Sequence, residues 1–519
     1  MPLHHGPPDP TNHTPKLHKE RHIRYWLRCL KTLLPTEYTS NDSNRMLLAF
    51  FIVSALDLLS ALNSHTTRDE RSSYIDWIYR CQHPQGGFRG FPATDFGPDL
   101  SSLENAHWDP ANLPATYLAL LNLVLLGDDL GRVRRRDCLR WLQRLQRDDG
   151  SFGEGLGEGG RVEGGSDTRF CHVAAGTRWI LRGQHSDGEE DIDVEGLVKF
   201  LKSLETYDHG ISEAPYHEAH AGFTYCAIGA LSFLNRLPQA EELRSEMLLK
   251  SDLRFLERTV QWLVSRQVIS VEESDDVEDE DSLNQEQFEA APTRGPSSPS
   301  QPGAAQTLPH DASAHRSGPS STEIRSQTPP AHLKMPISTF AAGFNGRCNK
   351  VTDTCYSFWV GGSLAMLHRE HLISADRNRE FLLNETQHSI GGFGKSPEDP
   401  PDVLHSFLGL AALSLLRPHS DSQASSVVIP PISDHSPVLV PPHDHPHAPF
   451  ISPHGGLPQV SPELTIDPNE APSEESSRLS GTEPAAPSER PDLKPLDPTM
   501  SISCSARWRI ENEIWPQWS

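Results

Sequence analysis

The feature that most constrains this chain is a repeat, in which a helical pattern ends in a glutamine and leads into a glycine-containing turn. Clear copies are WIYRCQHPQGGFRG from residue 77, WLQRLQRDDGSFGEG from 141 and FLLNETQHSIGGFGK from 381. Weaker copies are FLKSLETYDHGIS from 200 and WLVSRQ from 262, the latter separated from GFNGR at 343. The turn glycines Gly86, Gly150 and Gly210 are 64 and 60 residues apart. Units of this kind bury their apolar faces by stacking on one another.

A strongly apolar helical segment follows each turn. These segments cover 115–127, 170–181, 223–234, 355–367 and 405–416, and a further one, MLLAFFIVSALDLLSAL, begins at residue 46. Helices that are apolar on almost every side are typical of inner positions. We therefore predict an all-α fold, a barrel of five or six helix pairs in which the second helix of each pair lines the inside.

Composition indicates that this barrel is not the whole chain. Hydrophobic residues make up only 36% of it and there are 44 prolines, as expected if an ordinary apolar core is diluted by disordered segments. We predict a disordered N-terminus at 1–16, a barrel domain at 17–417, an acidic and Ser/Pro-rich insertion at 268–338 and a Pro/Ser/His-rich segment at 419–495. The final residues, 496–519, are apolar again and are expected to dock on the barrel.

Charge and cysteine content narrow the function classes. Much of the net charge of −24 comes from local runs such as 272–281, which has eight carboxylates and no cation, so it does not indicate an acidic catalytic domain. Nothing suggests nucleic-acid binding. The eight cysteines form no CxxC pair, and no signal peptide or 18-residue uncharged apolar run occurs. We expect a soluble, cytoplasmic protein with reduced thiols and no membrane span.

The chemistry-bearing residues concentrate in GFNGRCNKVTDTCYSFWVGG, which starts at residue 343. Arg347 and Lys350 suit a phosphate group, whereas Asp353 and Cys355 suit a divalent metal such as zinc. Taken alone, Cys355 is more often a buried thiol at the start of a helix. A metal beside a phosphate site suggests a reaction in which a thiol meets a phosphate ester.

His405 is the third candidate metal ligand. It lies in PPDVLHSFLGLAALSLL, within the first turn or two of an apolar helical pattern, where a lone histidine is usually a satisfied core residue. Aspartate, cysteine and histidine together have the three-ligand composition of a catalytic zinc site with one open position. Residues two apart on a regular helix diverge by about 200°, so Asp353 should lie at or just before the helix start if it shares a metal with Cys355.

These motifs resemble the β subunits of protein prenyltransferases, and among them those of protein geranylgeranyltransferase type I. The similarity rests on the DTCYSFWVG run, the preceding GFNGRCNK and the DVLH that follows, and extends over about 17–417 apart from the insertion. It implies an α/α toroid, one Zn²⁺ per β subunit held by Asp353, Cys355 and His405, and a separate α subunit.

The resemblance also implies roles for further residues. The diphosphate-binding group comprises His220, Arg347, Lys350, Tyr356 and Lys395, with Lys350 and Tyr356 counted among the catalytic residues. The isoprenoid tunnel is lined by Leu47, His172, Phe223, Cys226 and Trp359, of which the last four would otherwise be interpreted as ordinary core. Arg169 matches an arginine near the carboxylate of the peptide substrate. Here the chain departs from the family, because Gly165 and Asn112 replace an acidic residue and a histidine.

Two positions distinguish among the relatives. Leu47 stands where farnesyltransferases carry a tryptophan that shortens the tunnel. Lys395 replaces an aspartate associated with magnesium, so magnesium is not expected to be required. The resemblance thus implies transfer of geranylgeranyl from geranylgeranyl diphosphate to the cysteine of CaaX proteins such as Rho-type small GTPases.

Three alternatives remain. Farnesyl transfer is disfavoured by Leu47 and Lys395. A terpene cyclase of similar architecture would need an acidic DxDD proton donor, which the sequence lacks. A non-catalytic α/α-barrel scaffold belongs to a different class and would have no need of the zinc and diphosphate residues.

Overall fold

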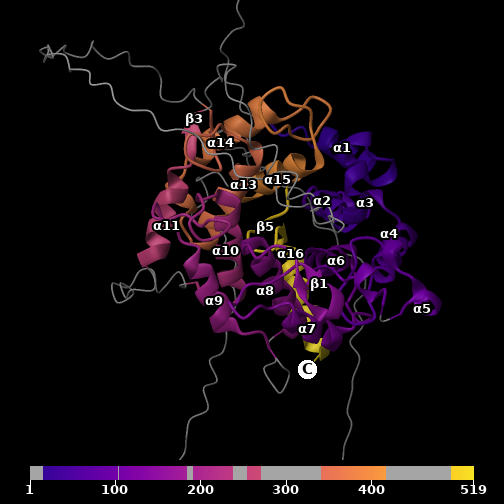
Figure 1. The fold of residues 1–519 in the computed structure, drawn as a ribbon. Helices are drawn as coiled ribbons and strands as arrows, with labels where there is room; N and C mark the ends of the chain where they lie inside the picture. The colour runs from indigo at the N-terminus through magenta and orange to yellow at the C-terminus, as the bar shows by residue number, and fades with distance from the viewer. Residues whose placement is uncertain are drawn as a thin grey trace, which may run out of the picture. The chain divides into compact units, whose positions relative to one another are not determined.

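Six apolar helices pack in a closed ring. The computed structural model describes residues 16–102, 104–183, 191–237, 254–269, 341–416 and 493–518, all within one unit, Met1–Pro418 with Pro491–Ser519. The ring helices are α2 (Arg45–Leu58), α6 (Leu113–Leu126), α8 (Thr168–Arg182), α10 (Ala221–Phe233), α13 (Thr354–Met366) and α15 (Val403–Leu415) (Figure 1). Each packs against the next, and α15 returns to α2. The predicted all-α barrel is confirmed.

Amphipathic helices accompany the inner ones. They are α1 (Lys19–Lys31), α4 (Arg68–Arg80), α7 (Arg135–Arg144), α9 (Val194–Ser203), α11 (Arg254–Val264) and α14 (Ala375–Glu380), which a π-helical segment, Phe381–Thr386, prolongs. Among these contacts, α1 packs on α2, α4 on α6, α7 on α8 and α11 on α13. Only one face of α7 is buried, whereas nearly all of α6 is. Two short helices, α3 (Leu62–His65) and α5 (Gly97–Leu100), lie in connections.

The repeat glutamines join neighbouring pairs. The side-chain amide of each accepts from a backbone N–H and donates to a backbone carbonyl just before the outer helix of the next pair. Gln82 binds Arg134 and Arg132, Gln146 binds Asp193, Gln267 binds Ser374, and Gln387 binds His18 and Lys16, all at 2.7–3.2 Å. The contact of Gln387 closes the ring, because it joins the last pair to the first. The third turn along the chain carries Glu205 instead, bonded to His209.

The close approach of neighbouring pairs also requires glycine in the turns. Gly86, Gly150 and Gly391 have φ values of 109°, 91° and 94°, which side-chain-bearing residues rarely adopt. A Cβ atom at each would also lie 2.1–2.3 Å from a backbone oxygen of the next outer helix. A larger residue would therefore push adjacent pairs apart.

Two short strands bridge the interrupted repeat. β3 (Gln267–Ile269) pairs antiparallel with β4 (Ala342–Phe344), so that Gln267 and Phe344 occupy the positions held by Gln82 and Phe88 in an uninterrupted turn. The expected insertion start at 268 is therefore two residues too early, since β3 continues to Ile269. Most of the segments predicted to be disordered lie outside the described residues. β1 (Gly155–Leu156) with β2 (Val162–Glu163), and β5 (Leu496–Asp497) with β6 (Ile502–Ser503), form the other pairs within the described part.

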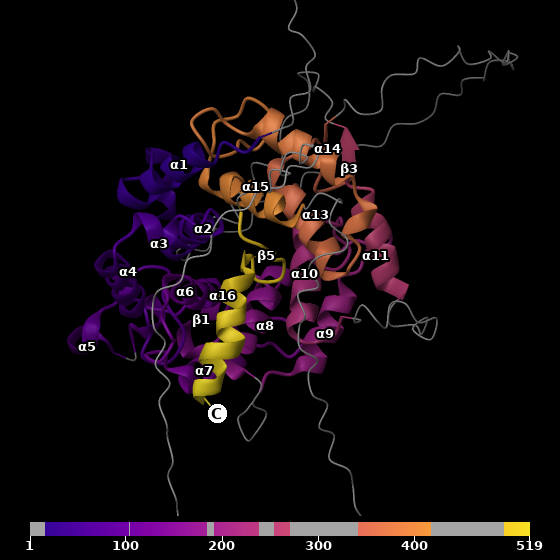
Figure 2. The ribbon, with the colours of Figure 1, turned by 180° about the vertical axis from the view of Figure 1, so that it is seen from behind.

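The C-terminal segment runs over the inner helices. Its helix α16 (Cys504–Arg509) continues to Trp518 and lies against α6 (Figure 2). Buried Asp57 of α2 accepts hydrogen bonds from Lys494 and Ser503, each at 2.5 Å. Arg509 donates to the carbonyls of Val124 and Gly127 at the end of α6. These contacts fix the C-terminal segment to the last turn of α2 and to the end of α6.

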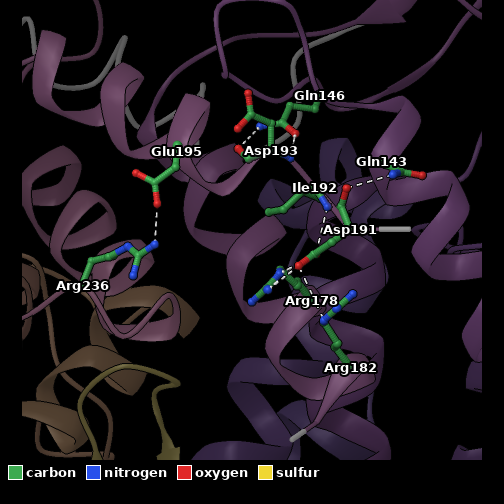
Figure 3. Close-up of polar contacts among 9 residues, drawn as sticks. All are labelled: Gln143, Gln146, Arg178, Arg182, Asp191, Ile192, Asp193, Glu195 and Arg236. Carbon is green, nitrogen blue, oxygen red and sulfur yellow. Dashed lines mark hydrogen bonds and ion pairs between the residues drawn. The ribbon is translucent and has the colours of Figure 1, made fainter. Parts of the chain in front are cut away.

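The connection into α9 is held by polar contacts (Figure 3). The Asp191 carboxylate lies between Arg178 and Arg182 of α8, at 2.5 and 3.5 Å. Burial opposes its ionisation, but Arg178 and Arg182 lower the pKa of Asp191 below its usual value. The connection is thereby fixed to α8, and Gln146 holds the next residues. Within the described residues, every helix is too short or too polar to cross a bilayer.

His22 is buried where the ring closes. Its Nδ1 accepts from the Gly392 N–H at 3.1 Å, so its Nε2 carries the proton and donates to Gln387 at 3.0 Å. The imidazole stacks on Phe393 with ring centroids 4.9 Å apart. Burial lowers the pKa of His22 to about 4. Protonation would remove the acceptor that Gly392 needs.

Stability should therefore decline in mild acid. An unfolded histidine has a pKa near 6.5, so between about pH 6.5 and 4 the unfolded chain binds a proton that folded His22 does not. The stability from neutral His22 is complete above about pH 6.5 and is lost as pH falls toward 4. We expect His22→Gln to reduce the pH dependence of the unfolding free energy by about one proton, measured by urea unfolding at several pH values. Exposed His371→Gln is the control, and an unchanged slope in His22→Gln would contradict the assignment.

Candidate metal and phosphate site

The candidate site lies where the inner helices begin. Five of these helices are capped by the side chain of the residue before them, which accepts a backbone N–H of the first turn. The caps are Asn112 for α6, Asp167 for α8, His220 for α10, Asp353 for α13 and Asp402 for α15, at 2.7–3.0 Å. The cap residues have extended backbone, as N-caps require.

Neighbouring helix starts are joined by backbone hydrogen bonds. The first residue of α10, Ala221, donates to the Gly346 carbonyl ahead of α13, and the first residue of α13, Thr354, donates to the Lys395 carbonyl ahead of α15, both at 2.9 Å. These helix starts therefore lie on one rim. The positive ends of their dipoles favour a bound anion there.

Three predicted ligands meet on this rim. Ligand atoms of Asp353, Cys355 and His405 all lie within 4.8 Å of one another, in a group that could hold a metal ion. The three residues are only 4%, 6% and 3% exposed. Asp353 is the N-cap of α13, with φ −142° and ψ 141°, which confirms its predicted place just before the helix. His405 lies in the first turn of α15, also as predicted.

A second carboxylate orients His405. Asp402 accepts the His405 backbone N–H with one oxygen at 2.9 Å and contacts Nδ1 with the other at 2.5 Å. Nδ1 therefore carries a proton, and Nε2 faces Asp353 at 3.3 Å. A carboxylate on the distal ring nitrogen is the usual support of a metal-binding histidine. Asp402 was not predicted from the sequence, although an aspartate three residues before a histidine at a helix start was a usable signal.

The charges of this group fit a bound cation. Burial disfavours a charged His405, but Asp353 and Asp402 together raise its pKa well above the ordinary value. Burial, with Asp353 beside it, raises the pKa of Cys355. Protonated His405 thus places a positive charge between the carboxylates of Asp353 and Asp402. A metal ion can supply that charge, which frees Nε2 of His405 and the Cys355 sulfur to act as ligands.

His220 and Tyr356 form a pair next to the metal group. Nδ1 of His220 accepts from the Gly222 N–H at 3.0 Å, so Nε2 carries the proton and donates to the Tyr356 hydroxyl at 3.0 Å. The Tyr356 hydroxyl can then donate its own proton to an oxyanion. Gly346 makes room for this ring, since a Cβ atom there would lie 2.1 Å from Cζ of Tyr356.

The predicted cations lie in the loops that lead into α13 and α15. Arg347 contacts Glu218 at 3.3 Å, and the Glu218 side chain is 55% exposed. Lys350 is half-buried, and its carbonyl accepts from Asn345 at 3.1 Å. Lys395, also half-buried, follows the turn whose Gly394 carbonyl accepts the Thr354 hydroxyl at 2.7 Å. His217, three residues before His220, is exposed.

The predicted tunnel residues divide into two kinds. Phe223 and Trp359 are half-buried on α10 and α13, and Leu47 is half-buried on α2. His172 and Cys226 are almost fully buried, and burial lowers the pKa of His172 to about 4. Phe223 lies 5.3 Å from the ring of His220, but Leu47 belongs to the other side of the ring, where α2 packs between α6 and α15.

Arg169 is held by a carboxylate that the sequence analysis did not identify. Both ends of its guanidinium fork contact Asp167, at 2.9 Å each, and its charge lies 5.4 Å from the Phe223 ring. Asn112 donates to Glu154 at 2.6 Å, and burial raises the pKa of Glu154. Helix-capping position was the available signal for Asp167, since it directly precedes an apolar helical pattern.

Comparison with known proteins agrees with this architecture. The family model described as prenyltransferase alpha-alpha toroid domain matches residues 17–501. Geranylgeranyl transferase type-1 subunit beta from Dictyostelium discoideum is 29% identical over 415 residues, 77% of this chain and 90% of the relative. Its namesake from Arabidopsis thaliana is 26% identical over 426 residues, 80% and 88% of the two chains. Protein farnesyltransferase subunit beta from Schizosaccharomyces pombe is 24% identical over 410 residues, 76% and 77%.

A solved structure shares the fold. Candida albicans protein geranylgeranyltransferase-I complexed with GGPP superposes with a TM-score of 0.60 at 22% identity, covering 96% of this chain and 99% of that chain.

Removing a ligand should remove the metal. We expect Cys355→Ala and His405→Ala to lose stoichiometric metal, measured by elemental analysis of the purified protein. Asp402→Asn keeps the three ligands and should weaken metal affinity by about 10–100-fold, because it acts only on the His405 ring. Cys226→Ala, which alters a buried thiol elsewhere, is the control. Full metal content in His405→Ala would exclude this group as the metal site.

Proposed function

This chain belongs to the prenyltransferase α/α toroid family, and we propose that it is the catalytic β subunit of a zinc-dependent protein geranylgeranyltransferase type I. Its reaction would transfer geranylgeranyl from geranylgeranyl diphosphate to the cysteine of CaaX proteins. One observation carries the proposal: the Asp353, Cys355 and His405 group lies beside the His220–Tyr356 pair, on adjoining helix starts. A thiol-activating site and a diphosphate site are thereby neighbours.

Asp353, Cys355 and His405 would hold the zinc. Three protein ligands of mixed oxygen, sulfur and nitrogen type leave a fourth position, as in catalytic zinc sites. Bound there, zinc lowers the pKa of a coordinated substrate thiol, so that the thiolate is present at neutral pH. Asp402 fixes the orientation of the His405 ring. Burial of all three ligands keeps water from competing for them.

The polar rim would stabilise the leaving diphosphate. As the bond between C1 of the isoprenoid and the diphosphate oxygen breaks, negative charge collects on the diphosphate. Tyr356, supported by His220, can donate to it, and Arg347, Lys350 and Lys395 add positive charge. The Arg347–Glu218 contact is partly exposed and therefore weak, so a diphosphate can take Arg347 from it.

The names of the two more similar relatives favour the geranylgeranyl over the farnesyl reaction. Leu47 agrees, because a leucine leaves room for an isoprenoid longer than a tryptophan would admit. The proposed partners are a prenyltransferase α subunit, geranylgeranyl diphosphate and CaaX proteins such as Rho-type small GTPases. The enzyme would act in the cytoplasm.

The direct test is co-expression with a prenyltransferase α subunit, followed by transfer assays with geranylgeranyl or farnesyl diphosphate and CaaX peptides. We expect geranylgeranyl transfer to a peptide ending in leucine or phenylalanine to be fastest. Preferential farnesyl transfer would favour the farnesyltransferase alternative. A metal-free, inactive heterodimer would favour the scaffold.

Leu47→Trp should change the preferred isoprenoid. A bulkier ring at this position would obstruct the end of a longer chain, so kcat/KM for geranylgeranyl diphosphate should fall by about tenfold or more relative to farnesyl diphosphate. Leu48→Trp is a matched control, because Leu48 is also half-buried but points in another direction from α2. Equal effects of the two substitutions would show that Leu47 does not limit isoprenoid length.

Because Lys395 stands at this position, we expect the transfer reaction to be independent of magnesium. Transfer should proceed with zinc and without added magnesium, because a lysine can neutralise diphosphate oxygens. Lys395→Asp removes a cation and adds an anion, and the rate without magnesium should fall by roughly 10²–10³. Adding magnesium should restore part of it. A wild-type requirement for millimolar magnesium would contradict this role.

A further inference from the structure

An exposed cysteine lies among cations close to the proposed diphosphate site. Cys348 follows β4 and sits between Arg347 and Lys350 in the loop that leads to α13. Five of the chain's eight cysteines are buried, Cys29 is half-buried, and Cys504 is the other exposed one. Cys348 is therefore one of two thiols that a solute can readily reach.

A buried arginine points at this sulfur. Arg266 is 6% exposed, and its Nη1 donates to Sγ of Cys348 at 3.2 Å. Its guanidinium lies over Trp262, 4.8 Å from the ring centroid, and its Nε has no hydrogen-bond partner. Among the residues that the structure describes, no carboxylate forms an ion pair with Arg266.

This environment favours chemistry at Cys348. A buried cation without a carboxylate is costly, and an anion beside it offsets that cost. Here the group beside it is the Cys348 sulfur. Reactive cysteines occupy exposed, electropositive surroundings of this kind, whereas buried structural thiols are inert.

We propose that Cys348 is a site of reversible thiolation by low-molecular-mass disulfides that carry carboxylates. The Cys348 thiolate attacks one sulfur of such a disulfide, the bond between its two sulfurs breaks, and a new disulfide forms between Cys348 and the attacked half. The other half leaves as a thiolate and takes up a proton. An added thiol reverses the exchange. Arg266, Arg347 and Lys350 attract the carboxylates.

Thiolation would interfere with diphosphate binding, a consequence that rests on the proposed function. The attached carboxylates would lie next to Arg347 and Lys350 and compete with the diphosphate for their charge. The metal group should be unaffected, because Cys355 is buried. The modification would therefore lower affinity for geranylgeranyl diphosphate without removing the metal.

The test uses the heterodimer with its metal, exposed to glutathione disulfide as the anionic probe and to cystamine as a cationic one. Peptide mass mapping should locate the glutathione adduct on Cys348. Its formation should be about tenfold or more faster than the cystamine adduct at low ionic strength, because the surrounding charge steers anions. Cys348→Ser should abolish the adduct, and Cys504→Ser should leave it unchanged.

Arg266→Gln should slow the glutathione reaction, and the charge comparison in the unmutated protein stands even if that variant folds poorly. Equal rates for the two probes, or an adduct mainly on Cys504, would overturn the proposal. Affinity for geranylgeranyl diphosphate should fall on thiolation and return with dithiothreitol, while Cys348→Ser is insensitive. Unchanged affinity in the thiolated protein would overturn the link to diphosphate. Failure of the unmodified protein to bind geranylgeranyl diphosphate would instead count against the proposed function, and mass mapping would still decide the thiolation.

Discussion

The polar residues of the candidate site are brought together because the inner helices need N-caps. A helix start presents N–H groups without partners inside the helix, and here neighbouring starts share one rim. Short polar residues that satisfy these groups are therefore concentrated in a small space. Asp353 caps α13 with the same carboxylate that faces His405, and Asp402 caps α15 while it holds the His405 ring. His220 caps α10 and donates to Tyr356. Three groups that complete helices thus also belong to the site, either directly or by orienting a neighbour.

The repeating parts of the fold, and the site residues that are close together in the sequence, could be predicted from the sequence. Apolar patterning located the inner helices to within a few residues, and the two-residue spacing of Asp353 and Cys355 required a cap position that the structure confirms. Pairings across long separations were not predictable, since nothing local marks them. The contact of Gln387 with Lys16 spans 371 residues, and that of Arg266 with Cys348 spans 82. Asp402 was missed because its role depends on the direction of the His405 ring.

The interrupted repeat shows which part of the unit carries the architecture. β3 and β4 keep the register of an ordinary turn, with Gln267 opposite Phe344, although more than seventy residues separate them in the chain. Gln267 still binds Ser374 as its counterparts bind theirs. The hydrogen bonds of the glutamine and the buried phenylalanine opposite it are therefore sufficient to define the turn, and the residues between them can vary. Because the loop that carries Arg347 and Lys350 follows β4 directly, the positions of these two residues depend on this pairing.

Ring closure through Gln387 and His22 gives the barrel no terminal repeat. Linear repeat proteins need polar capping units at both ends, and fraying there is the easiest route to unfolding. In a closed ring each helix pair has a neighbour on both sides, so loss of any pair exposes two apolar faces at once. Unfolding should then begin with loss of ring closure rather than with stepwise loss of repeats from one end. It also follows that the contacts between neighbouring pairs do not depend on which helix pair comes first in the chain.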